Sequence, residues 1–161
     1  MAASVVSRSA SAPPEKRMWL EPIARELGDA RGLGITLGNL GLSWLKLGAL
    51  DQADQHLQEG LQLNRAVGDR LSESNQLCNL SQLALYRGDA GAALAHARAG
   101  LEISIAVEDR RTQVFAMCAL GNAELAAGRP GQATEAFERA RATTLEAASP
   151  TRHDACAGLA R

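Results

Sequence analysis

Apolar residues in the middle of the chain recur every three or four positions, the spacing of one face of an α-helix. One such stripe is formed by Leu37, Leu40, Gly41 and Trp44 and ends at Gly48. Glycine adopts the left-handed backbone conformation without a Cβ clash, so Gly48 predicts the end of this helix. A second stripe follows a short polar stop, and the two stripes together predict a helical hairpin.

The second stripe predicts a helix that packs against the first. Its inner positions are Ala53, Leu57, Gly60, Leu61 and Asn64. An aspartate side chain accepts hydrogen bonds from the free N–H groups at a helix start. We therefore expect Asp51 to cap the second helix and Asp69 to cap the first helix of the next hairpin.

The hairpin pattern is repeated along the chain at a fixed interval. The pairs Gly28-Asp29, Gly68-Asp69 and Glu108-Asp109 stand 40 residues apart, and several leucine, glycine and alanine positions keep the same step. A period of this length indicates a solenoid or a related array. The sequence predicts an array over residues 21–161, with repeats at about 29–68, 69–108 and 109–148.

The two ends of the chain are incomplete with respect to this repeat. Residues 21–27 align with the end of a second helix, and residues 150–161 align with a first helix. The final helix is either a cap or part of a longer array, and both alternatives stay open. Residues 1–20 are rich in Ser, Ala and Pro and are predicted to be a disordered tail or linker, with a transit peptide as the alternative.

The stretch Asn39 to Leu61, "NLGLSWLKLGALDQADQHLQEGL", resembles the tetratricopeptide repeat (TPR) family. The matching positions are Leu40, Gly41, Trp44, Gly48, Ala53 and Leu57. The period of 40 exceeds the usual length of about 34 and resembles the subclass with lengthened helices. Ala84 and Glu124 stand where the family favours an aromatic residue, so the later hairpins are expected to pack less tightly.

The resemblance implies an all-α fold, a right-handed α-solenoid of stacked antiparallel hairpins. It also implies a noncatalytic module that binds a peptide or protein segment in a concave groove lined by the first helices. The family's groove-facing positions correspond to Ile35, Leu42, Lys46, Asn75, Asn79, Gln82, Tyr86, Phe115 and Asn122. Amides there would bond to a peptide backbone, although Ile35 and Phe115 fit a core position equally well. The alternative is a regulatory or oligomerisation segment of a larger signalling or transcription-regulator protein.

Composition and charge bear on the fold class, on the kind of partner and on the location of the protein. Only 3% of the 161 residues are aromatic, which favours helices over strands. The net charge of −1 is scattered, so no basic stripe predicts nucleic-acid binding, and no apolar run predicts a membrane span. The three cysteines, without a secretory segment, predict reduced thiols and a cytoplasmic location. Self-association through exposed terminal helices is a further expectation.

Motifs that carry chemistry have simpler explanations here. "GLGITLG" at 32–38 lacks the residues and the preceding strand of a nucleotide-binding loop, so its glycines predict close helix packing. His153 and Cys156 are chance neighbours on a helix rather than a catalytic pair. Equivalent thiols such as Cys78 and Cys118 lie too far apart for a disulfide. We expect no enzyme activity, cofactor or metal.

Basic residues follow the aspartates at the start of each first helix. They are Arg31, Arg70 and Arg110. A cation near a helix N-terminus is disfavoured by the helix dipole. These arginines are therefore predicted to form solvated ion pairs with carboxylates of neighbouring units.

Overall fold

The computed structural model describes residues 28–148. This part of the chain consists of six helices joined by short turns: α4 (Ala30–Lys46), α5 (Leu50–Ala66), α6 (Arg70–Tyr86), α7 (Ala90–Ala106), α8 (Arg110–Ala126) and α9 (Pro130–Ala148). It contains no strand between residues 28 and 148. The predictions for the tail at 1–20, the partial helix at 21–27 and the final helix at 150–161 lie outside the described residues.

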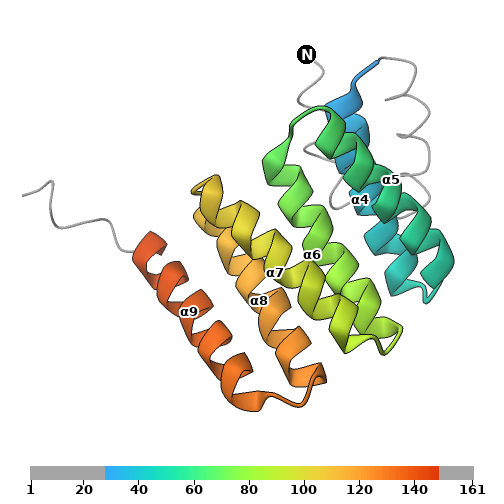
Figure 1. Cartoon of the computed structure of the whole chain (residues 1–161). Coiled ribbons are helices and arrows are strands. Elements are labelled where there is room, and N and C mark those ends of the chain that lie inside the picture. The colour runs from blue at the N-terminus through green and yellow to red at the C-terminus, as the bar shows by residue number, and fades with distance from the viewer. Residues whose placement is uncertain (1–27, 149–161) are drawn as a thin grey trace, which may run out of the picture.

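The helices form three hairpins, α4–α5, α6–α7 and α8–α9, which follow one another along the array (Figure 1). The two helices of each hairpin pack together, and each hairpin packs on the next. In addition, α6 lies against both α4 and α8, so the first helices of the hairpins form a layer of their own. The fold is therefore all-α and solenoid-like, as the repeat predicts. The right-handed twist stays a prediction.

The turns between helices depend on glycine. The backbone has a positive φ at Gly48, Gly68 and Gly88, with +77° at Gly88. Side chains with a Cβ strongly disfavour this region, so the predicted helix end at Gly48 is confirmed, and Gly68 and Gly88 have the same role in later turns. At the equivalent point of the third repeat, Glu108 adopts the same conformation with φ 56°, although it carries a side chain.

Aspartates cap the first helices of the hairpins. The side chains of Asp29, Asp69 and Asp109 each accept a hydrogen bond from the backbone N–H three residues ahead. The predicted cap at Asp69 is thus confirmed. The predicted cap at Asp51 is wrong, because α5 begins at Leu50 and Ala49 occupies the cap position without a side-chain hydrogen bond. Asp51 lies in the first turn instead.

The core follows the predicted stripes. All five predicted inner positions of α5 are buried, Ala53, Leu57, Gly60, Leu61 and Asn64. Small residues in the first helices allow close packing within each hairpin: a Cβ at Gly41 would lie 2.5 Å from the Leu57 side chain, and one at Gly121 would lie 2.5 Å from the Phe137 ring. In the second hairpin Ser81 donates its hydroxyl to the Ala93 carbonyl, 2.9 Å away. Glycine and serine here place two helices in direct contact.

The third hairpin replaces the expected aromatic residue with a buried carboxylate. Glu124 is 5% exposed and accepts hydrogen bonds from Arg98 at 3.0 Å and Arg129 at 3.3 Å. These arginines come from α7 and from the turn before α9, so the carboxylate joins α7 and α8 to the turn that leads into α9. In the second hairpin the corresponding Ala84 is buried in an alanine-rich cluster.

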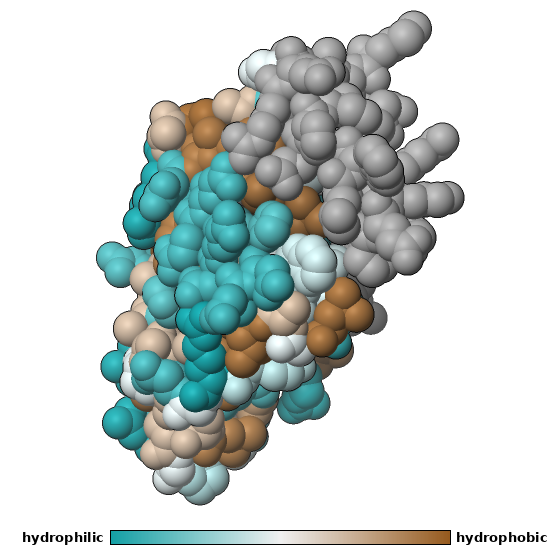
Figure 2. Space-filling view, turned by 90° about the vertical axis from the view of Figure 1, so that its right-hand side faces the viewer, coloured by the Kyte–Doolittle hydropathy of each residue, from teal (hydrophilic) through white to brown (hydrophobic). Residues whose placement is uncertain are grey.

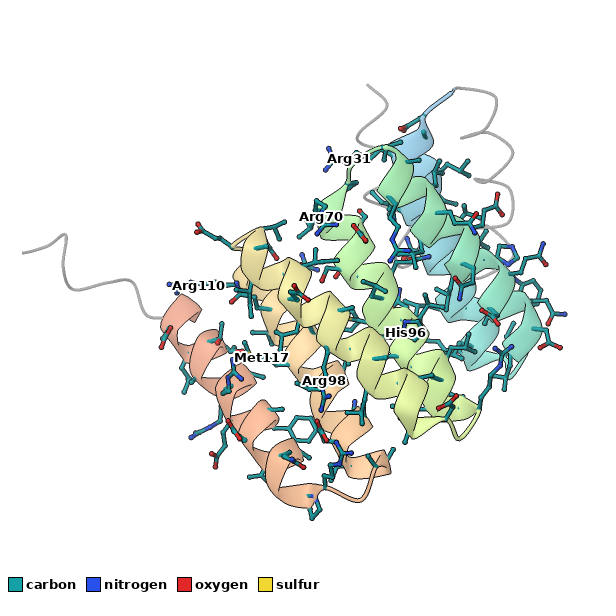
Figure 3. The ribbon with its side chains drawn as sticks, viewed as in Figure 1. Arg31, Arg70, His96, Arg98, Arg110 and Met117 are labelled. Atoms are coloured by element: carbon teal, nitrogen blue, oxygen red, sulfur yellow. The ribbon has the colours of Figure 1, made fainter. Side chains whose placement is uncertain are left out.

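The three arginines at the helix starts lie along one edge of the array (Figure 3). Arg31 binds Asp69 of the next cap at 2.7 Å, which confirms its predicted ion pair. Arg70 binds Glu73 of its own helix at 2.6 Å, so the prediction of a neighbouring unit is wrong there. The error arises because Glu73, three residues ahead, lies on the same face of α6 as Arg70 and is within reach of its guanidinium. Arg110 forms no ion pair with another described residue.

Candidate binding groove

A groove of about 510 Å³ opens on the layer of first helices. Its described walls come from α4, α6 and the start of α8, and Asn64 of α5 reaches it from behind. Five residues predicted for a groove line it together: Ile35, Leu42, Asn75, Asn79 and Phe115. The structure thus brings together part of the predicted set from all three hairpins.

The other four predicted residues do not line this groove. They are Lys46, Gln82, Tyr86 and Asn122, all exposed on the same three helices. They come one to three turns later along these helices than the residues that line the groove. The prediction carried over the TPR family's groove-facing positions, whereas the hollow depends on where neighbouring helices leave room.

Apolar side chains stand at the mouth of the groove. Ile35 is 36% exposed and Phe115 is 41% exposed, and Leu71 is similarly accessible. The alternative that Ile35 and Phe115 are core residues is therefore not what the structure shows. These side chains offer apolar contact area to a ligand that crosses from α4 to α8.

The floor of the groove is lined with amides. Asn64, Gln76 and Asn79 are all buried there. Gln76 donates its Nε2 to the Leu57 carbonyl at 2.9 Å, which ties α6 to α5. Asn64 has no hydrogen-bond partner in the described part of the chain for either amide atom, and the same holds for Asn79 Oδ1.

Glycines of "GLGITLG" make room for these amides. A Cβ at Gly34 would collide with the Asn64 amide oxygen, and one at Gly38 would lie 2.5 Å from Gln76 Oε1. Gly60 of α5 also approaches the α4 backbone, since its Cβ would lie 3.2 Å from the Gly34 carbonyl oxygen. The predicted close packing is present. Sequence reasoning missed that the same glycines shape the groove, although their spacing was the available clue.

Charged residues occupy only one end of the described groove lining. Asp109 and Arg111 lie there, at the start of α8. Hydrogen bonds from Thr112 lower the pKa of Asp109, which keeps this carboxylate ionised in its capping role. An ionised cap that is already hydrogen-bonded does not suit proton transfer at neutral pH. The lining is thus suited to binding through amides and apolar surface.

Other groups lie away from the groove. Cys78 and Cys118 are free thiols, and burial raises the pKa of Cys78 to about 12. Burial also lowers the pKa of His96. Between residues 28 and 148 no group of three His, Cys, Asp or Glu side chains is arranged to hold a metal ion. None of the described helices is long and apolar enough to cross a bilayer.

Comparison with known proteins bears on the fold alone. No protein-family model matches the sequence, and no curated protein is significantly similar to it. The structure is similar to the crystal structure of BtubC (BKLC) from P. vanneervenii, with a TM-score of 0.70 over 92% of this chain. The two sequences are 18% identical, and the match spans 62% of the BtubC chain. At this identity the likeness supports a shared helical architecture.

Proposed function

We propose that this chain is a TPR-like module that binds an extended peptide or protein segment in the groove formed by α4, α6 and α8. Binding is noncatalytic, and the setting is cytoplasmic. The observation that carries the proposal is the groove itself, in which predicted ligand-facing residues from three hairpins line one hollow of about 510 Å³.

The residue types in the groove suit a segment of protein chain. Asn75 and Asn79 of α6 offer amide donors and acceptors of the kind that bond to peptide groups. Ile35 and Phe115, on either side, provide apolar contacts for side chains of the ligand. A ligand held in this way contacts all three hairpins, so its affinity depends on the whole array.

The opposite layer offers a contrasting surface. Exposed residues on α5 include Gln55, Gln58 and Gln62. Figure 2 shows the side of the molecule on which α5 lies, with hydrophilic side chains gathered into a continuous area. A polar, solvated surface of this kind gains little from burial. We therefore expect it to contribute nothing to ligand affinity.

The test is a selection of peptides from a randomised display library on the 161-residue chain, followed by titration of the selected peptides. The double variant Asn75→Ala with Phe115→Ala should weaken binding at least about tenfold, about 1.4 kcal/mol, without loss of helicity. The matched control is Gln58→Ala with Gln62→Ala, which should bind like the parent. Loss of binding in the control alone would place the site on the α5 side and overturn the proposal.

A further inference from the structure

Among the three described hairpins, the first alone has glycines at two positions in the floor of the groove, and the place without α4 side chains is called the window. Gly34 and Gly38 stand on adjacent turns of α4 and both line the groove. The equivalent positions of α6 carry Ser74 and Cys78, whose side chains are fully buried. Because α4 has no side chains at these two positions, the amides of Asn64 and Gln76 pack against its backbone there, and Asn64 of α5 becomes part of the groove lining.

The polar side chain of Asn64 is buried at the end of this window. It is 1% exposed, and neither its Oδ1 nor its Nδ2 has a partner in the described part of the chain. Its counterpart in the second hairpin, Ser104, donates to the Leu101 carbonyl at 2.8 Å. A buried amide without hydrogen-bond partners destabilises a fold. The Asn64 side chain thus offers an unpaired hydrogen-bond donor and an unpaired acceptor side by side at the end of the window.

We propose that this window is a specificity pocket for a primary carboxamide, the side chain of a Gln or Asn in the bound segment. The inference rests on the proposed function, because it assigns one pocket within the same groove. The ligand carboxamide donates an N–H to Asn64 Oδ1 and accepts from Asn64 Nδ2. Asn79 Oδ1, also without a partner, is a second acceptor on the groove lining.

Geometry selects a side chain over the peptide main chain. A primary carboxamide carries its C=O and one N–H on the same edge, so it forms two hydrogen bonds with another carboxamide. In a trans peptide group the N–H and C=O point in opposite directions. Asn64 also lies behind α4, and a main chain that crosses the first helices does not reach it. Entry requires the side chains around the window to move apart.

Hydrogen-bond chemistry selects an amide over an acid. A carboxylate has no donor for Asn64 Oδ1 and would be desolvated in the window without a cation beside it. The described ionic residues of the groove lining, Asp109 and Arg111, both lie at the α8 end. Gln76 does not compete for the ligand through its Nε2, which already donates to Leu57. The pocket should therefore distinguish Gln from Glu.

A fragment titration tests the pocket without any peptide. The probes are acetamide, acetate and N-methylacetamide, added to the ¹⁵N-labelled chain while the side-chain amide signals of Asn64 are followed by NMR. Acetamide should shift these signals, and the other two probes should not. The absence of a shift with acetamide, or an equal shift with N-methylacetamide, would overturn the proposal.

A variant separates binding from folding. Asn64→Leu removes the unpaired amide but keeps a side chain of similar size, so the melting temperature should be equal to or above that of the parent. Backbone amide signals of the other groove residues, which acetamide should also shift in the parent, should no longer respond in this variant. An undiminished response of the remaining groove signals in a folded Asn64→Leu variant would place the acetamide elsewhere and overturn the assignment.

The peptides from the library selection provide the second readout. Selected sequences should share a Gln or Asn at one position, and its change to Glu or Asp should weaken binding about tenfold or more. Peptides that bind the groove but tolerate this change would overturn the carboxamide pocket and leave the proposed function intact. An acetamide response without any peptide bound by the groove would overturn the proposed function and leave carboxamide binding at Asn64 intact.

Discussion

The guanidinium Nε of Arg31 lies 2.7 Å from the Asp69 carboxylate, so the start of α4 is bound directly to the cap of α6. The Asp69 side chain is 4% exposed, whereas that of Arg31 is 70% exposed. The same carboxylate accepts hydrogen bonds from the backbone N–H and the hydroxyl of Ser72 at 3.1 and 3.0 Å. One side chain therefore starts a helix and joins two hairpins.

This carboxylate should make stability depend on pH. Burial raises the pKa of Asp69, but hydrogen bonds from Ser72 and the contact with Arg31 outweigh it, and the pKa lies below its ordinary value. Since the folded pKa is below the unfolded value of about 3.9, ionised Asp69 stabilises the fold above about pH 4. The contribution is lost as the pH falls through the folded pKa.

Asp69→Asn should therefore flatten the acid side of the stability profile. Asparagine still caps a helix but does not pair with Arg31, so a loss of about 0.5–1 kcal/mol is expected at pH 7 and less near pH 3. Urea unfolding at both pH values measures this. Asp51→Asn, at an exposed carboxylate, is the control and should stay within about 0.5 kcal/mol of the parent. Equal losses at both pH values would contradict the role given to ionised Asp69.

Replacing Glu108 with glycine should increase the stability of the fold. Glu108 has φ 56°, a conformation that disfavours side chains with a Cβ, and the equivalent turns use glycine. Glu108→Gly is expected to stabilise the fold by about 0.5 kcal/mol or more. Gly88→Val, the opposite change at φ +77°, should destabilise it by about 1 kcal/mol or more. Thermal melting of both variants, followed by circular dichroism, would show opposite shifts.

The start of α5 lacks the cap that α7 has. Ala49 has φ −85° and ψ 75° without a side-chain hydrogen bond, and Asp89 has φ −93° and ψ 84° with one to the Ala92 N–H. Ala49→Ser should stabilise the fold by about 1 kcal/mol, and Asp89→Ala should destabilise it by a similar amount. Serine avoids a further negative charge next to Asp51. Denaturant unfolding with no gain for Ala49→Ser would contradict the capping geometry.

The buried carboxylate of Glu124 should be replaceable by an apolar residue, whereas its partners should not be removable. Glu124→Leu eliminates the desolvated charge and should stay within about 1 kcal/mol of the parent. Arg98→Ala combined with Arg129→Ala leaves the carboxylate buried without a partner and should destabilise the fold by about 2 kcal/mol or more. A double arginine variant as stable as Glu124→Leu would show that the ion pairs contribute nothing.

Most of the fold could be predicted because the same helical-hairpin pattern occurs three times in the sequence. The turn at Gly68, the cap at Asp69 and the inner stripe of α5 each follow from local rules of helix geometry and capping. Asp51 was assigned wrongly because its residue type fits a cap, while the position of the preceding turn decides which residue occupies it. The prediction for Arg70 failed because a carboxylate three residues ahead in its own helix, that of Glu73, pairs with it.

The site was less predictable, because a groove depends on space between helices. The resemblance to the TPR family implied that Ile35, Asn75 and Phe115 share one face, and these three line the same groove. The resemblance also selected Tyr86, and the structure shows that this residue lies outside the groove. The contribution of Asn64 was hidden, since a buried polar residue in an inner stripe is recognised as unpaired only when its neighbours are placed.

The packing of hairpin on hairpin also governs the order in which the array opens. Substantial contacts join helices of the same hairpin or of adjacent hairpins. Short sequence separations favour rapid folding, and helices with fewer packed neighbours open more readily. Amide hydrogens of α6, which lies against α4, α5, α7 and α8, should therefore exchange with solvent more slowly than those of α9. A ligand that spans α4 to α8 would slow this fraying, so hydrogen exchange reports its binding even without a change in shape.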